Sequence, residues 1–442
     1  MTSTSPVHRC LATMVLTGLM VMLPGPDSAR AQIPVDTQHV ASQHGHASGD
    51  TLRLADALQM VRSANPLLAA ARLEADAALE RIAPAAALPD PELTFGLIDR
   101  PIGNFNADER MTMNEVKLSQ RFPWPGKRGL AREEATLRAT ALEFSASESV
   151  LALEALTKAQ YFDLAVTDRT LAVLERSREL MRDWLEVAQT LYSVGERPQQ
   201  DLFQGQVALA QLSEEIILME HAREVDAARL NALLGRSASN SVGPVELPPI
   251  GDELPSLDSL RALALSRRPA LRAAELQQQA AAASVRRAAR DFYPDVMVGL
   301  SYGQRPNFDD MTSLTVGFTL PLRTGSLQQP IRREMEALEI RAAALTRDLQ
   351  NSTDVELTEQ HTMVEHSRAL HRLYLTGILP QAEAAVAAAV SAYRVGKVDF
   401  LTVIENQMTV NRYQIEMFRV TARLHHAVAR IDALLGGGGA TP

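Results

Sequence analysis

The sequence predicts a mainly helical α+β fold, in which a long coiled-coil helical tunnel continues into a transmembrane β-barrel that closes only when several chains associate. The same unit occurs twice along the chain. Each unit has two short segments of alternating apolar and polar residues, and one long run whose apolar residues recur every seven positions. Aromatic residues make up only 5% of the chain, which favours long helices with thin apolar seams over a thick core.

The N-terminus reads as a secretory signal. His8 and Arg9 precede an apolar run at 11–23, and the small-x-small sequence at 29–31 is a cleavage site. We therefore expect a signal peptide at 1–31, followed by a polar N-terminal arm at 32–50. The apolar run is too short for a spanning helix, and no later stretch approaches the roughly 20 apolar residues that one needs. Any membrane insertion of the mature chain must then use strands.

Charge and cysteine content exclude several classes of function. The formal net charge is −9, and removing Arg9, Arg30 and Asp27 with the signal takes away a net +1, which leaves −10. This acidic balance argues against nucleic acid as a partner. The one cysteine, Cys10, leaves with the signal, so no thiolate metal ligand or disulfide is expected in the mature chain.

Matched segments indicate a tandem duplication. Residues 91–97 match 294–300 at an offset of 203, and residues 192–195 and 230–235 match 393–396 and 431–436 at an offset of 201. The breaker-rich stretch at 243–255 reads as the linker between the two units. The units are therefore placed at 51–242 and 256–436, with a disordered tail at 437–442.

Each unit begins with a predicted helix, at 52–86 and at 256–291. Thr51 is the N-cap candidate of the first, and Ser256 or Asp258 that of the second. A β-hairpin follows in each unit, with period-two alternation in four segments, at 92–98, 114–122, 296–302 and 314–320.

Long helices follow the hairpins, at 127–194 and 327–395. Their apolar residues recur every seven positions, which indicates a coiled-coil seam; these residues are Leu130, Leu137, Phe144 and Leu151, and then Ile331, Leu338 and Leu345. Gly195 and Gly396 stand where a glycine cap would end these helices. Returning helices then run to 234 and 435.

The four strands suit a membrane barrel. Val298, Leu300, Val316 and Phe318 are expected to face lipid, whereas Gly299, Ser301, Gly317 and Thr319 face the lumen. An ordinary soluble sheet with one face on a core would alternate in the same way. However, four strands cannot close a barrel, whose minimum is about eight, and open edges in lipid would leave backbone groups unpaired. Several chains must therefore contribute strands to one barrel.

At this point the sequence resembles the TolC-type outer-membrane efflux family, over essentially all of the mature chain. Besides the repeat, three local matches carry the resemblance; they are the strand entries at 88–91 and 293–295, the exit at 120–128, and the two Tyr-x-Val-Gly turns. The resemblance implies a homotrimer in the outer membrane of a Gram-negative bacterium. Twelve strands would form one barrel in outer-membrane lipid, and the helices would form a tunnel through the periplasm.

The same resemblance implies partners and a class of substrates. The far end of the tunnel would dock on a periplasmic adaptor protein and an inner-membrane pump, and the pump is expected to be of the RND type. The Pro-Trp-Pro-Gly-Lys sequence at 123–127 is similar to members that are paired with heavy-metal efflux pumps. Metal cations or small toxic compounds are the expected substrates, and an exit duct for secreted polypeptides would share the fold.

Members of this family close the periplasmic end with side chains six and nine positions after the turn glycines. Here Asp201 and Gln204 lie six and nine positions after Gly195, and Thr402 and Glu405 lie six and nine positions after Gly396. Thr402 departs from the acidic pattern, which would reduce the charge of the aperture or move it to Asp399.

Two cations stand beside these acids, and we expect Arg197 and Lys397 to hold the closed state against repulsion between like charges. The alternative is that Asp201 and Asp399 are helix N-caps and that Glu405 is a solvated helix residue. A ring of acids about a trimer axis is compatible with both interpretations.

The exposed turns themselves are candidates for adaptor contact. Val194 with Gly195, and Val395 with Gly396, would offer a small apolar docking surface. Alternatively these glycines are simple helix stops.

No Ser/His/acid set, metal-ligand spacing or phosphate loop occurs, so we expect no enzyme, no cofactor and no resident metal. The rival outside this class is a soluble periplasmic coiled-coil scaffold. Such a protein would have no reason to place two hairpins of alternating apolar and polar residues at one end of its helices. It would also have no reason to gather aromatic residues such as Phe122, Trp124 and Tyr293 around them.

Overall fold

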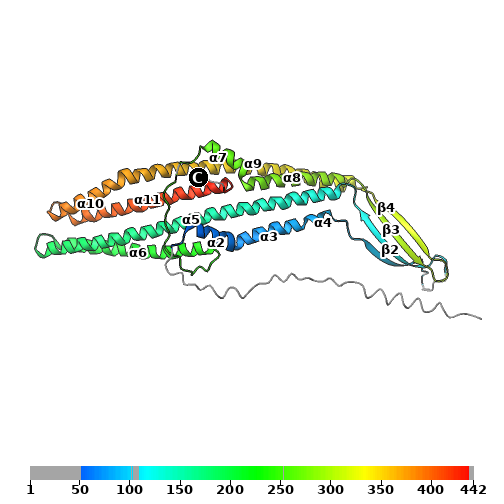
Figure 1. The fold of residues 1–442 in the computed structure, drawn as a ribbon, viewed down its shortest axis with the longest axis horizontal. Helices are drawn as coiled ribbons and strands as arrows, with labels where there is room; N and C mark the ends of the chain where they lie inside the picture. Colours follow the sequence, from blue (N-terminus) through cyan, green and yellow to red (C-terminus); the bar gives the residue numbers. More distant parts are fainter. Residues whose placement is uncertain (1–50, 101, 103–108, 252, 438–442) are drawn as a thin grey trace, which may run out of the picture. The chain divides into compact units, whose positions relative to one another are not determined.

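The computed structural model describes residues 51–100, 102, 109–251 and 253–437. The predicted signal peptide and N-terminal arm lie outside the described residues, as do most of the first hairpin loop and the tail from residue 438. Within the described residues, each unit consists of helices and two strands in the predicted order. The four strands of the two units form one sheet. The expected mainly helical α+β fold with a tandem repeat is confirmed (Figure 1).

The first unit contains α2 (Leu54–Ala64), α3 (Pro66–Glu80), α4 (Ile82–Ala86), β1 (Glu92–Ile98), β2 (Met113–Phe122), α5 (Lys127–Ser193) and α6 (Gln199–Leu233). The second contains α7 (Leu257–Arg267), α8 (Pro269–Arg290), β3 (Asp295–Gln304), β4 (Met311–Thr319), η1 (Thr324–Gln328), α9 (Gln329–Leu373), η2 (Tyr374–Ile378), α10 (Leu379–Arg394) and α11 (Phe400–Leu434). The segments η1 and η2 are π-helical turns, so the second long helix is continuous but locally widened.

The first helix of each unit is broken, where the sequence predicted a single helix. The breaks fall at Asn65-Pro66 and Arg268-Pro269, which are equivalent positions of the repeat. Proline forces the preceding residue out of the helical region, and Asn65 and Arg268 have extended backbone with ψ of 123° and 119°. The Asn65 side chain then caps α3 by accepting from the Leu67 N–H at 2.9 Å.

The predicted N-caps of the two units have different outcomes. In the first unit the N-cap of α2 is Arg53 instead of Thr51, and its side chain makes no capping bond. In the second unit Ser256 is the N-cap of α7, and its Oγ accepts from the Ser259 N–H at 3.4 Å.

The strands form an antiparallel sheet in the order β1-β2-β3-β4. Because the pairing has no slip, residues on one face align across the strands. Leu118 pairs with Leu300, which pairs with Leu314, and Val298 pairs with Val316. On the opposite face Ser119 pairs with Gly299, which pairs with Thr315. The alternation read from the sequence thus becomes one apolar face and one small or polar face of a single sheet.

A polar and aromatic junction fixes the point at which β2 leaves the sheet for α5. Asp295 accepts from the Trp124 N–H at 2.9 Å and from Lys127 Nζ at 2.9 Å. The Trp124 ring stacks on Tyr293 with centroids 5.1 Å apart. Since Trp124 and Lys127 belong to the first unit and Tyr293 and Asp295 to the second, this junction ties the exit of the first β-hairpin to the entry of the second.

The longest helix, α5, packs on both units. It contacts α6 of its own unit, and α8 and α11 of the other. Leu164 and Ala165 lie in one apolar cluster, which also contains Val242 and Val245 of the linker region. Met181 lies in a second cluster nearer the turns, together with residues of α6, α10 and α11. In Figure 1 these helices run side by side between the sheet and the two turns.

One helix, Thr324–Arg394, is long and apolar enough to cross a membrane by length and composition alone. No such helix was predicted from the sequence, and the difference arises from the alanine-rich stretch before Tyr393. Leu379, Ala389 and Tyr393 of this helix are buried within the chain, and α10 packs on α11. We therefore treat it as a tunnel helix.

The sheet faces generate a first prediction. We expect Val316→Arg to cost about 2–4 kcal/mol of stability in the membrane, because the charge would lie on the lipid-facing side of a strand. Thr315→Arg, one residue earlier on the opposite face, is the matched control and should assemble like the parent. Unfolding titrations in lipid vesicles measure both. Assembly abolished by Thr315→Arg but not by Val316→Arg would invert the assignment of the faces.

Candidate functional site

Two tight turns lie at the ends of the helices far from the sheet. At Gly195 and Gly396 the backbone φ is +80°, which glycine adopts without strain. Gly195 N–H donates to the Tyr192 carbonyl at 2.9 Å, and Glu196 N–H to the Leu191 carbonyl at 2.9 Å. The bonds at Gly396 repeat this pattern. Both turns are therefore Schellman caps, as the glycine-stop interpretation predicts.

An apolar side chain stands at the tip of each turn. Val194 is 66% exposed and Val395 is 67% exposed. The structure thus places the predicted contact residues at the surface, and the glycines act as helix stops. Adaptor contact by these residues stays a prediction.

The two helical hairpins, α5–α6 and α10–α11, are joined near their turns by three side chains, Arg197, Tyr393 and Asp201, which we call the clasp. Tyr393 precedes the second turn and is 3% exposed. Its hydroxyl donates to Asp201 Oδ2 at 3.0 Å. The Arg197 guanidinium donates to the Tyr393 carbonyl and lies 4.4 Å from the centroid of its ring. One buried tyrosine of the second unit is thereby held by a cation and an anion of the first.

Burial raises the pKa of the Tyr393 phenol well above its ordinary value, and the hydrogen bond to Asp201 raises it further, while Arg197 opposes the shift. Because the pKa is raised when the clasp is formed, the clasp favours the neutral phenol. Its contribution is complete below the ordinary tyrosine pKa of about 10 and is lost as the pH rises through the raised pKa.

Asp201 is 5% exposed and lies in the first turn of α6, after the N-cap Pro198. The interpretation of Asp201 as an N-cap is therefore wrong. Asp399 does occupy the N-cap position of α11, but its side chain makes no capping hydrogen bond.

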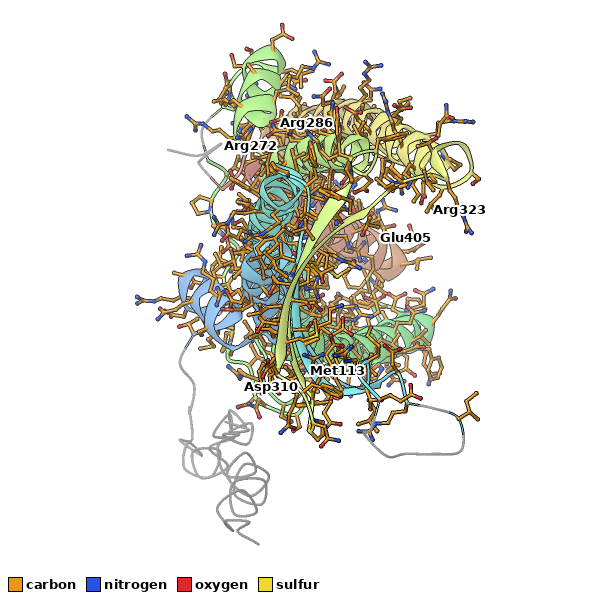
Figure 2. All side chains as sticks on the ribbon, turned by 90° about the vertical axis from the view of Figure 1, so that its right-hand side faces the viewer. Met113, Arg272, Arg286, Asp310, Arg323 and Glu405 are labelled. Atoms are coloured by element: carbon orange, nitrogen blue, oxygen red, sulfur yellow. The ribbon has the colours of Figure 1, made fainter. Side chains whose placement is uncertain are left out.

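The other predicted gate residues stand apart from the clasp. Lys397, Asp399 and Glu405 are exposed, and Thr402 is half-buried. Figure 2 shows Glu405 on α11, away from Met113 and Asp310 at the sheet. Within the described part of the chain, no ion pair joins Lys397 to these acids. They remain predicted gate residues, whereas Arg197 and Asp201 are brought together by contact with Tyr393.

Sequence reasoning missed Tyr393 as a site residue. The residue was visible in the Tyr-x-Val-Gly repeat, and its counterpart Tyr192 occupies the same place in the first turn. The one available signal was a difference between the units, because Asp201 is acidic and its counterpart Thr402 is not. This difference marks Asp201 as a residue with a contact of its own, but it does not identify the partner. An interaction that differs between the two units leaves no trace in the repeat.

Comparisons with known proteins agree with this architecture. The family described as "Outer membrane efflux protein" matches residues 57–236 and 260–437, once in each unit. The chain is 26% identical over 434 residues to the cobalt-zinc-cadmium resistance protein CzcC of Cupriavidus metallidurans, with 95% of this chain and 98% of CzcC covered.

A second relative is the pyoverdine export outer membrane protein OpmQ of Pseudomonas putida, 25% identical over 474 residues, with 98% of each chain covered. Among solved structures, the outer membrane protein VceC of Vibrio cholerae has a similar fold, with a TM-score of 0.74 at 18% identity. That likeness covers 87% of this chain and 96% of VceC.

The clasp generates a second prediction. We expect Tyr393→Phe to loosen the two turns, since it removes a buried hydrogen bond to a carboxylate and costs about 1–3 kcal/mol. Val194→Cys with Val395→Cys gives two exposed sites for spin labels. No other cysteine would be labelled, because Cys10 lies in the predicted signal peptide. Electron–electron double resonance should then show a broader distance distribution in the Tyr393→Phe background.

Tyr192→Phe is the matched control, because Tyr192 is the counterpart of Tyr393 in the first turn and is 40% exposed. Arg197→Ser should broaden the distribution as Tyr393→Phe does. The parent should broaden only as the pH exceeds about 10, the ordinary tyrosine pKa. Equal distributions in the parent, Tyr393→Phe and Arg197→Ser would show that these contacts do not hold the turns together.

Proposed function

Because this chain belongs to the outer membrane efflux protein family, we propose that it conducts metal cations, or else small toxic compounds, out of a tripartite efflux system. It is an outer-membrane efflux channel that extends into the periplasm of a Gram-negative bacterium, and it is not an enzyme. The observation that carries the proposal is the pairing of a membrane-suited sheet at one end of the helices with a clasped pair of turns at the other.

Channels of the TolC family are trimers, and this chain has surfaces that suit one. The sheet order leaves β1 and β4 as its two edges, so β4 of one chain can pair with β1 of the next. Apolar side chains of the predicted coiled-coil seam on α9 are exposed on the single chain, including Ile331, Leu338 and Leu345. A neighbouring subunit that covers this seam would remove it from water.

The clasped turns correspond to the closed periplasmic end of such a channel. Arg197, Tyr393 and Asp201 hold the two hairpins of one chain together, while Asp399, Thr402 and Glu405 remain free to line the aperture. Three copies of the exposed Glu405 around the axis would make a ring that favours cations. Lys397, exposed at the second turn, would offset part of that charge.

A periplasmic adaptor protein is the partner proposed for the turns. Val194 and Val395 are exposed apolar side chains at the tips, and Gly195 and Gly396 keep the surrounding backbone accessible. A partner that contacts the open tips better than the closed ones shifts the equilibrium toward opening. The inner-membrane pump that supplies substrate would be of the RND type.

Metal cations are the first substrate class because of sequence likeness to proteins of metal resistance. CzcC is described as a cobalt-zinc-cadmium resistance protein, and it matches nearly the whole chain. The exit sequence at 123–127, with Trp124 and Lys127 in the junction, is similar to heavy-metal members of the family. The likeness to OpmQ, described as a pyoverdine export protein, supports small organic compounds as the second class.

A deletion strain tests the proposal. We expect loss of this chain to sensitise the bacterium to Co²⁺, Zn²⁺ and Cd²⁺, and the parent gene to restore resistance. Val194→Asp with Val395→Asp should fail to restore it, because charged tips would not pack on an apolar adaptor surface. The same variant must still assemble and conduct in planar bilayers, which separates lost docking from lost folding.

Two results would count against this account. Sensitivity to organic compounds with unchanged metal resistance would reassign the substrate to the second class. Unchanged sensitivity to both classes would contradict export by this channel.

A further inference from the structure

We infer that Phe400 is a positioning residue of the clasp, and that it acts by packing its ring into the space left by Gly205. The inference rests on the proposed function, in which the clasp holds the periplasmic end closed. The gate predicted from the sequence consisted of charged and polar residues, and Phe400 would add an apolar contact to it.

Phe400 is the first residue of α11 and is fully buried at 0% exposure. Its ring centroid lies 5.1 Å from that of Tyr393, with the planes inclined by 45°. Arg197 approaches the same tyrosine ring at 4.4 Å. Tyr393 therefore has a cation and an aromatic ring as neighbours, and its hydroxyl reaches Asp201 with the ring held by both.

Gly205 lies one helical turn after Asp201 on α6, and it leaves room for the Phe400 ring. A Cβ atom at position 205 would lie 2.8 Å from Phe400 Cε1 and 2.7 Å from Leu185 Cδ1. Both distances are shorter than real Cβ contacts allow, so any side chain at this position would displace the ring or Leu185. Glycine also weakens a helix interior relative to alanine, which indicates that it has a packing role here.

The repeat shows that this packing is not required by the hairpin fold itself. At the offset of 201, the counterpart of Phe400 is Gln199 and the counterpart of Gly205 is Asn406. The equivalent turns and helices form in both units with these different residues. The pair is therefore specific to the contact between the two hairpins of one chain, where the clasp also lies.

The packing couples the apolar and polar parts of the contact. Phe400 also lies in the cluster that contains Tyr393, Ala208 and Leu212, so movement of α11 away from α6 must withdraw the ring and release Tyr393 together. Closely packed side chains have discrete arrangements, which makes such a contact a two-state element. We therefore expect the closed state to depend on Gly205 as strongly as on the hydrogen bond to Asp201.

Gly205→Ala tests this in the full-length channel, measured by single-channel recording in planar bilayers. The overlap with Phe400 should destabilise the closed state and raise the open probability about tenfold. Gly129→Ala is the matched control, because it makes the same change in a helix and its Cβ would meet nothing within 4 Å. The control should gate like the parent.

A double variant separates gating from general damage. Gly205→Ala combined with Phe400→Leu removes the overlap with the ring but not the overlap with Leu185 Cδ1. Because the ring is already gone, the open probability of the double variant should stay close to that of Phe400→Leu alone instead of rising by both factors. Phe400→Leu alone should raise the open probability, because Tyr393 loses its packing. All variants are compared at equal content of assembled channel after heating in detergent, so that a folding defect is not read as gating.

Gating of Gly205→Ala that equals the parent and the Gly129→Ala control would overturn the inference. So would a double variant whose open probability exceeds that of Phe400→Leu by the full Gly205→Ala factor, because the two positions would then act independently. If Gly205→Ala is inert while Tyr393→Phe opens the channel, the clasp stands without Phe400. If both are inert, the proposed gate itself is misplaced.

Discussion

The need to pair the two open edges of the four-stranded sheet determines how the rest of this molecule is arranged. β1 and β4 each present unpaired backbone N–H and C=O groups along one side, and in lipid no water can satisfy them. The apolar face that includes Leu300, Leu314 and Val316 suits lipid, so the edges must be paired by other chains. Three copies supply twelve strands, enough to close a barrel, and the helices that continue from them then surround a common axis.

Because the unit is duplicated, each chain contributes two similar units to a channel made of three chains. Each unit delivers one hairpin to the sheet and one pair of helices to the tunnel, so three chains present six similar units. The two turns share their backbone hydrogen bonds, but the residues that follow them differ. Asp201 and Arg197 hold Tyr393 within one chain, whereas their counterparts at Thr402 and Val398 have neither charge. The clasp therefore has no chemical equivalent after the second turn.

Much of the fold could be predicted from the sequence because it depends on local periodicity and on glycine and proline. Period-two alternation located all four strands, and Gly195 and Gly396 located the turns. The breaks at Asn65 and Arg268 were predictable from the prolines that follow them, yet the apolar pattern continues across both and concealed them. Tyr393 was visible in the Tyr-x-Val-Gly repeat, but its partner was not predictable, because it meets Asp201 across 192 positions of the chain. The roles of Glu405 and Asp399 stay predictions, since they depend on neighbouring subunits.

The mass of the purified channel tests the central constraint most directly. Closing the sheet edges requires three chains, so light scattering with correction for bound detergent should give a protein mass three times that of the mature chain. The particle should lose solubility when detergent is removed. A water-soluble particle with the mass of one chain would contradict the account, because its sheet edges would then be open to water and no barrel could form.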